Sequence, residues 1–154
     1  MTQGLKGVLI LVGLLLLVAL AYFGGRAWQS SQAAYTRIAP TPACDLRAGP
    51  CRQAVAGGHI SLAITPHEIP LMQPLRLVLE TKGLTVRGVE VEIRGLNMDM
   101  GLNRTVLVQT ADGHWEGETI LPICSQRTME WEAAVRLDSA GRVEVPFVFH
   151  TTRP

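Results

Sequence analysis

Apolar and polar residues alternate with a period of two through most of the chain after position 55. This pattern is typical of half-buried β-strands, whose side chains point to opposite faces in turn. Seven such segments predict strands at 59–65, 75–80, 89–94, 104–109, 115–120, 129–135 and 143–149. Asp112-Gly113 and Ser139-Ala140-Gly141 separate consecutive segments and have the composition of hairpin turns. About seven short strands at this spacing predict an all-β fold, specifically an immunoglobulin-like β-sandwich.

The N-terminal segment has a different pattern. Residues 7–25 are apolar and uncharged, lie between Lys6 and Arg26, and are long enough to cross about 30 Å of hydrocarbon. Because the apolar run continues through Phe23, it exceeds the ~7–15 residues of a usual signal-peptide core, and we expect an uncleaved transmembrane helix. The triplet Ala19-Leu20-Ala21 also fits a signal peptidase site, so secretion after cleavage is the alternative.

These patterns predict four parts of the chain. They are a cytoplasmic N-terminus at 1–6, a membrane anchor at 7–25, a linker at 26–43 and an extracytoplasmic β-domain at 44–154. The linker is polar and contains prolines, which suits a short tether. About 110 residues remain for the β-domain, enough for a core of its own.

The cysteines indicate the compartment of the β-domain. Cys44 and Cys51 bracket a short loop with Gly49 and Pro50, and an oxidising compartment favours its closure by a disulfide. We therefore predict a Cys44–Cys51 disulfide outside the cytoplasm and an unpaired Cys124. A Cys51–Cys124 pair, or free cysteines in the cytosol, are the alternatives that the sequence leaves open.

The charges of the chain argue against nucleic acid as a partner. The sequence has 14 Lys and Arg and 13 Asp and Glu, and only Lys6 among them precedes Arg26. The part from Arg26 onward is therefore charge-balanced, with both signs interspersed. A nucleic-acid-binding surface needs a basic patch, which this distribution does not predict.

Sulfur-containing residues gather in two segments between expected strands. Met98 and Met100 lie two residues apart in GLNMDMG, and Cys124 and Met129 lie in the connection that follows Pro122. Thiolate and thioether are soft ligands that select Cu(I) over harder ions. If both loops lie at one end of the sheet, these four residues predict a Cu(I) site.

Other residues take part in this hypothesis with smaller weight. His67 and Met72 are either auxiliary ligands or ordinary loop residues, and Trp131 is either a core residue or a cation–π cover for the ion. Asp99 fits a turn or solvent better than a soft-metal site. The alternative for the methionines is core packing, since methionine is a common filler of irregular gaps.

Signatures of an enzyme are absent from the sequence. It has no nucleophile elbow, no His-Glu-x-x-His, no phosphate-binding glycine loop and no Cys-x-x-Cys. We therefore expect a protein without catalytic activity. A thiol-based redox partner that uses Cys124 is a further reading of the lone cysteine.

An apolar N-terminal segment, NMDMG at 97–101 and LPICxxxxMxW at 121–131 together resemble the membrane-anchored, extracytoplasmic FixH and YtkA-like proteins. Those groups are linked to copper handling and cytochrome oxidase assembly in bacteria. The resemblance implies a single-pass inner-membrane protein with its C-terminal domain in the periplasm and a membrane metalloenzyme such as an oxidase as partner. The expected function is to buffer or deliver Cu(I), and the alternative is a metal-free structural or assembly subunit.

Overall fold

The computed structural model describes residues 2–31, 35–40 and 44–153. The chain forms two compact units, Met1–Ala34 and Tyr35–Pro154, and we call the second unit the sheet domain. The first unit is one helix, α1 (Thr2–Ser31), which covers the apolar run at 7–25. Within the positions of α1 whose side chains are described, 7–8 and 11–25, no stretch is both long and apolar enough to cross a membrane. The transmembrane anchor is therefore not shown and stays a prediction from the sequence.

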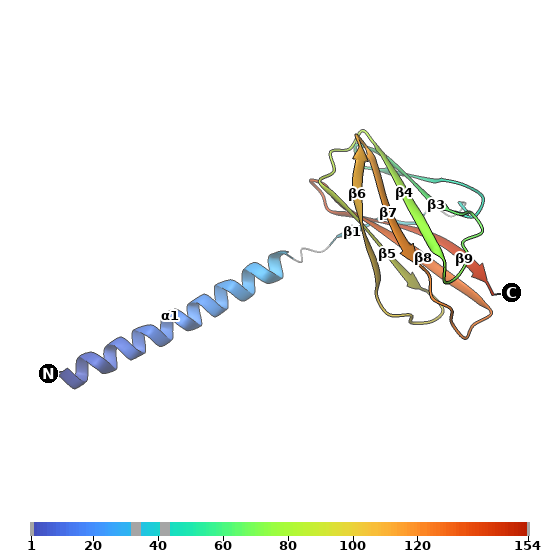
Figure 1. Cartoon of the computed structure of the whole chain (residues 1–154). Coiled ribbons are helices and arrows are strands. Elements are labelled where there is room, and N and C mark those ends of the chain that lie inside the picture. Colours follow the sequence, from blue (N-terminus) through green and yellow to red (C-terminus); the bar gives the residue numbers. More distant parts are fainter. Residues whose placement is uncertain (1, 32–34, 41–43, 154) are drawn as a thin grey trace. The chain divides into compact units, whose positions relative to one another are not determined.

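In the described part of the sheet domain, nine strands form one curled sheet (Figure 1). Their order across the sheet is β1-β9-β8-β5-β6-β7-β4-β3-β2. The strands are β1 (Thr36–Arg37), β2 (Cys51–Val55), β3 (Gly58–Thr65), β4 (Pro74–Lys82), β5 (Gly88–Gly95), β6 (Asn103–Ala111), β7 (His114–Ile120), β8 (Thr128–Asp138) and β9 (Val143–Thr152). All neighbouring pairs are antiparallel except β1 and β9, which run parallel.

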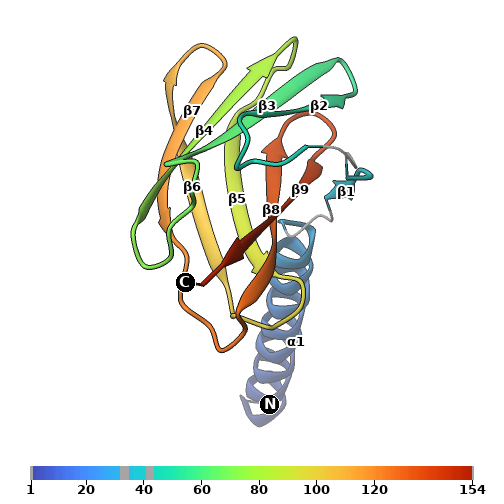
Figure 2. The same cartoon turned by 90° about the vertical axis from the view of Figure 1, so that its right-hand side faces the viewer.

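Strand β6 joins the two halves of the sheet. Its first part, Asn103–Leu107, pairs with β5, and from Val108 onward it pairs with β7 (Figure 2). The two halves enclose one core, to which Leu62 and Leu77 contribute from one half and Val135 from the other. The alternation that predicted the strands is therefore the alternation between this core and solvent.

The structure confirms the all-β fold and the seven strands expected from the sequence, which correspond to β3 through β9. It does not confirm the immunoglobulin-like arrangement, because β6 connects both halves into one nine-stranded sheet. The expected linker at 26–43 contains β1, which pairs with the start of β9 at Val143 and Glu144. The sheet domain therefore begins earlier than position 44, where the sequence placed it.

The predicted disulfide is present. Cys44 and Cys51 are bonded, with their Cα atoms 5.6 Å apart, and Cys124 is a free, buried cysteine. The alternative Cys51–Cys124 pair is therefore not formed.

Candidate functional site

The β5–β6 and β7–β8 connections lie together at one end of the sheet domain, which we call the sulfur end (Figures 1 and 2). Register explains why, because Gly95 at the end of β5 is opposite Trp131 near the start of β8. The pairing continues past the strand, where the Leu96 amide donates to the Glu130 carbonyl at 2.8 Å. The first loop therefore begins directly beside the second.

Asn97 fastens the β5–β6 connection to the start of β8. Its side-chain Nδ2 donates to the Thr128 carbonyl oxygen at 3.1 Å, and its Oδ1 accepts from the Glu130 amide at 3.2 Å. One amide side chain thus satisfies both a donor and an acceptor of the neighbouring strand. This contact holds the residue before Met98 in a fixed position against β8.

Met98 contacts the segment that carries Cys124. The Ser125 hydroxyl donates to Met98 Sδ at 3.8 Å, within the distance for a hydrogen bond to sulfur. Ser125 is the neighbour of Cys124 in the chain, so a thioether of the first loop lies beside the backbone that holds the thiol. The two sulfur-bearing segments therefore meet in space, which the sequence could only state as a condition.

Met100 and Met129 converge on Gly95. A Cβ atom at Gly95 would lie 3.0 Å from Met129 Cε and 3.4 Å from Met100 Cγ, and it would overlap the Met98 carbonyl oxygen. The glycine is required because the loop folds back tightly over the end of β5. The side chains of Met100 and Met129 and the backbone carbonyl of Met98 thus approach one point of the chain.

The four sulfur-bearing residues differ in exposure. Met129 and Cys124 are 1% and 8% exposed, whereas Met98 and Met100 are half-buried and pack against the core. The Cys124 thiol donates to the Gln126 carbonyl oxygen at 3.6 Å. Of the four residues, Met98 and Met100 are therefore the more accessible to a ligand.

The donor set at the sulfur end is soft. Among the described residues, no group of three or more His, Cys, Asp or Glu side chains is placed to hold a metal ion. A metal site here would need the thioethers of Met98, Met100 and Met129 beside the single thiol of Cys124. Such a set suits Cu(I) and not zinc or a hard divalent ion.

The secondary residues of the prediction have separate places. Met72 donates its amide to the Leu121 carbonyl at 2.8 Å, but its side chain is exposed. His67 lines a shallow pocket of about 340 Å³ with Asp45 and Arg47, residues that carry no sulfur. The structure thus brings the Met72 backbone to the sulfur end and gives no contact between His67 and the predicted sulfur ligands.

Asp99 and Trp131 have structural partners. An Asp99 side-chain oxygen accepts from the Gly101 amide at 2.9 Å, the pattern of a turn-forming aspartate. Trp131 is 1% exposed, and its indole donates to Thr151 Oγ1 at 2.9 Å. The expectations of a turn-former and of a core tryptophan fit these contacts.

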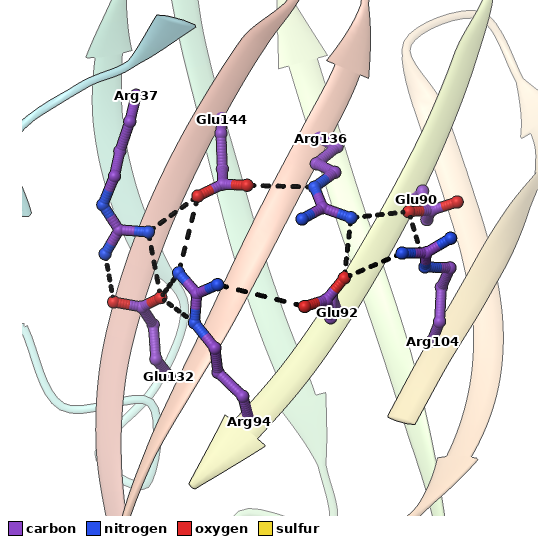
Figure 3. A network of polar contacts seen from close by, with 8 residues as sticks. All are labelled: Arg37, Glu90, Glu92, Arg94, Arg104, Glu132, Arg136 and Glu144. Atoms are coloured by element: carbon purple, nitrogen blue, oxygen red, sulfur yellow. Dashed lines mark hydrogen bonds and ion pairs between the residues drawn. The ribbon is translucent and has the colours of Figure 1, made fainter. Parts of the chain in front are cut away.

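A network of ion pairs covers the outer face of β1, β9, β8, β5 and β6 (Figure 3). Every member pairs with at least one residue of opposite charge, and arginines and glutamates are equal in number, so the network is neutral. Its members are Arg37, Glu90, Glu92, Arg94, Arg104, Glu132, Arg136 and Glu144. Because these charges compensate one another, the network itself has no excess charge with which to attract a charged ligand.

The network shifts the pKa values of three of its members. Burial alone would raise the pKa of Glu144, but hydrogen bonds from Arg136 and Arg37 outweigh burial and hold this pKa below its ordinary value. Hydrogen bonds from Arg37 to Glu132 and Glu144 raise the pKa of Arg37 despite its partial burial. Burial alone would lower the pKa of Arg136, but its hydrogen bonds to Glu144 and Glu90 outweigh burial and leave this pKa raised. The network therefore holds β1 to β8 and β9 with groups that stay ionised.

No family model matches this chain, and neither a curated protein nor a solved structure is similar to it. The resemblance to the FixH and YtkA-like groups therefore rests on the apolar N-terminal segment and on the NMDMG and LPICxxxxMxW segments, and it stays a resemblance. Copper binding stays a prediction, and its support is the geometry of the sulfur end.

Three residues organise this site in ways that sequence reasoning did not predict, although it named Gly95 as a point where the loop can bend and Asn97 as part of the NMDMG segment. Gly95 permits the close fold of the first loop, Asn97 links it to β8, and Ser125 contacts the Met98 sulfur. A glycine directly after an alternating strand is a signal for close backbone approach. The partners of Asn97 and Ser125 are 27 or more residues away in the chain, so no local pattern indicates them.

Proposed function

We propose that this chain is a membrane-tethered Cu(I)-binding protein that buffers or delivers copper and has no catalytic activity of its own. The observation that carries the proposal is the meeting of the two sulfur-bearing loops, with Met98 beside Ser125 and with Met100 and Met129 beside Gly95. The proposed ligands are Met98, Met100, Cys124 and Met129.

The chemistry of these ligands suits a cargo ion. The Cys124 thiolate would neutralise the single charge of Cu(I), and thioethers bind without releasing protons because they carry none. Met98 and Met100 are half-buried, so two of the four proposed ligands are partly accessible to an ion or to a partner's ligands. A site of this kind holds copper and can pass it to another ligand set.

The proposed location is the outer side of a bacterial inner membrane. Residues 7–25 are uncharged over the length of a membrane span, and α1 includes them all. The Cys44–Cys51 disulfide suits an oxidising compartment such as the periplasm. A tether raises the effective concentration of a copper donor near an acceptor in the same bilayer, such as an oxidase.

Anaerobic Cu(I) titration of the full-length chain in detergent, against a competing chelator, tests the proposal. We expect tight one-to-one binding that a Met98→Leu/Met100→Leu double variant weakens at least tenfold and that Cys124→Ser also weakens. Met72→Leu is the matched control, because Met72 is an exposed thioether of the same end and is expected to leave the affinity within about twofold. Absence of binding above the chelator background would refute the proposal.

A second function has its own supporting observation. Met129 and Cys124 belong to the core cluster, and Met98 and Met100 pack against it, so the sulfurs also serve as packing groups. On this reading the protein is a metal-free structural or assembly subunit. The two functions separate in one comparison: an assembly subunit keeps its partner complex when Met98 and Met100 become leucine, and a copper carrier loses its metal.

A further inference from the structure

Exposed large apolar side chains of the sheet domain gather at the sulfur end. Five of them lie in or beside the loops there: Met72, Leu96, Leu102, Ile120 and Ile123, which we call the apolar rim. Leu102 and Ile123 are 73% and 54% exposed, so their side chains point largely into solvent. The other exposed large apolar residues of the described sheet domain, Val106, Val108 and Val148, lie on strands.

Hydrogen bonds connect the segments of the rim around the sulfur-bearing loops. The Met72 amide donates to the Leu121 carbonyl at 2.8 Å, and the Asn103 side chain donates to the Ile120 carbonyl at 2.9 Å. Asn103 follows Leu102 in the chain, so the segments of Leu102 and Ile120 are bonded to each other. The rim residues therefore lie on hydrogen-bonded segments at one end of the sheet domain.

The sulfur site lies within this region. Leu96 precedes Asn97, which is bound to β8, and Ile123 precedes Cys124. Met98, two residues after Leu96, accepts through its Sδ from the hydroxyl of Ser125, two residues after Ile123. The rim residues Leu96 and Ile123 therefore lie on the same two loops as the proposed sulfur ligands.

Folding does not require these side chains to be exposed. Contiguous apolar surface on a soluble domain marks an interaction site, because it gains free energy only when another surface covers it. Isolated exposed apolar residues are normal on a protein surface. Five such residues, from three connections at the same end of the sheet domain, require an explanation. Something is expected to cover the sulfur end.

We propose that the apolar rim is the docking surface for the protein that exchanges Cu(I) with the sulfur site, a partner that presents its own sulfur ligands within an apolar face. This inference rests on the proposed function and names its partner. The partner is inferred from the position of the rim around the proposed sulfur ligands. During exchange, the ligands of donor and acceptor must contact the same ion while the surfaces around them exclude water. Apolar surfaces on both sides do so without leaving polar groups unpaired.

Charges around the rim do not favour a lipid surface. Arg127 and Arg153 lie beside the Cys124 segment, where the Arg153 side chain donates to the Cys124 carbonyl at 3.3 Å. Asp99 and Glu130 lie beside the other loop, so the nearby cations are matched by anions. Binding to an anionic bilayer needs an excess of Lys and Arg, which this end does not have.

Site-specific photo-crosslinking of the full-length chain in its native cells tests the proposal. A benzophenone side chain replaces Leu102 or Ile123, and Val108, equally apolar and 68% exposed on β6, is the control position. We expect one adduct of the same mass from both rim positions and none from Val108. A dimer of this chain, an adduct to lipid, no adduct, or the same adduct from Val108 would each overturn the proposal.

The captured protein is then purified and used as the copper acceptor. We expect a Leu102→Ser/Ile123→Ser variant to transfer Cu(I) to it at least tenfold more slowly, while Val108→Ser transfers at the normal rate. Loading of the same variant from a Cu(I)–glutathione complex should be unchanged, because a small thiol needs no docking surface. Equal transfer rates for rim variant and control would contradict docking, whereas failure of every variant to load copper would contradict the proposed function instead.

Discussion

Replacement of Gly95 by alanine tests the fold of the sulfur end at its tightest point. The added Cβ would overlap the Met98 carbonyl oxygen and press on Met129 Cε at 3.0 Å, so the backbone of the first loop must move. Overpacking of this kind costs about 1–3 kcal/mol, and the loss of glycine freedom in the unfolded chain offsets up to ~1 kcal/mol of it. We expect the free energy of unfolding to fall by about 1–2 kcal/mol. Because Met98 moves, we also expect at least a tenfold loss in Cu(I) affinity.

The matched control lies at the other end of the same strand. A Cβ at Gly88 would meet only Asp138 Cβ, at an ordinary 3.9 Å, so Gly88→Ala should be neutral or slightly stabilising. Thermal unfolding followed by the near-ultraviolet circular dichroism of buried Trp115 and Trp131 measures the difference. For a domain of this size the expected decrease in Tm for Gly95→Ala is about 3–10 °C. Equal Tm values for the two variants would refute the close approach at Gly95.

Three further predictions concern the ion pairs and the disulfide. Glu132→Gln weakens the contacts of a buried carboxylate with Arg37 and Arg94. It should lower the free energy of unfolding by about 1–2 kcal/mol in urea titrations, a moderate value because both arginines are partly solvated. The control Glu130→Gln changes an exposed residue and should alter the free energy of unfolding by less than ~0.5 kcal/mol. The pKa of Glu144 is lower in the folded than in the unfolded protein, so the contribution of Glu144 to stability is complete above the ordinary pKa of 4.5 and declines as the pH falls below it. Glu144→Gln should therefore flatten the acid side of a curve of unfolding free energy against pH. An unchanged slope would contradict this. Cys51→Ser opens a loop closed across a sequence separation of 7 and should cost about 2–3 kcal/mol, which reduction of the wild-type protein should reproduce in the same urea titration.

The strands were readable from the sequence because burial alternates along much of the sheet, most regularly in β3 and β4. In β4 the buried positions are Leu75, Leu77 and Leu79, separated by a polar or less buried residue each time. Strand β1 gave no such signal, because it has only two residues and both are exposed. Its place is fixed by Arg37, whose partners Glu132 and Glu144 lie 95 and 107 residues further along the chain.

The arrangement of the sheet could not be read in the same way. An alternating pattern states that a strand has one buried face and does not state which strands lie beside it. The change of partner along β6, from β5 to β7, depends on such pairings, and it joins the strands into one curled sheet. The sequence therefore predicted the all-β class, and the immunoglobulin-like arrangement stays a prediction.

The candidate site was predictable in composition and not in geometry. Scarcity of sulfur elsewhere pointed to Met98, Met100, Cys124 and Met129, because unusual residue types stand out without knowledge of the fold. Their meeting depends on the pairing of β5 with β8 and on Asn97, both of which are long-range. The apolar rim likewise becomes visible only when exposure is known, since leucine and isoleucine in a sequence first suggest core.

X-ray absorption at the copper edge, on full-length protein loaded with one equivalent of Cu(I), tests the central claim most directly. The account predicts a first coordination shell of sulfur alone, with fewer sulfur scatterers in Cys124→Ser and in the Met98→Leu/Met100→Leu variant, and an unchanged shell in Met72→Leu. A shell dominated by nitrogen or oxygen, or one that none of these substitutions alters, would show that copper does not bind where the two loops meet.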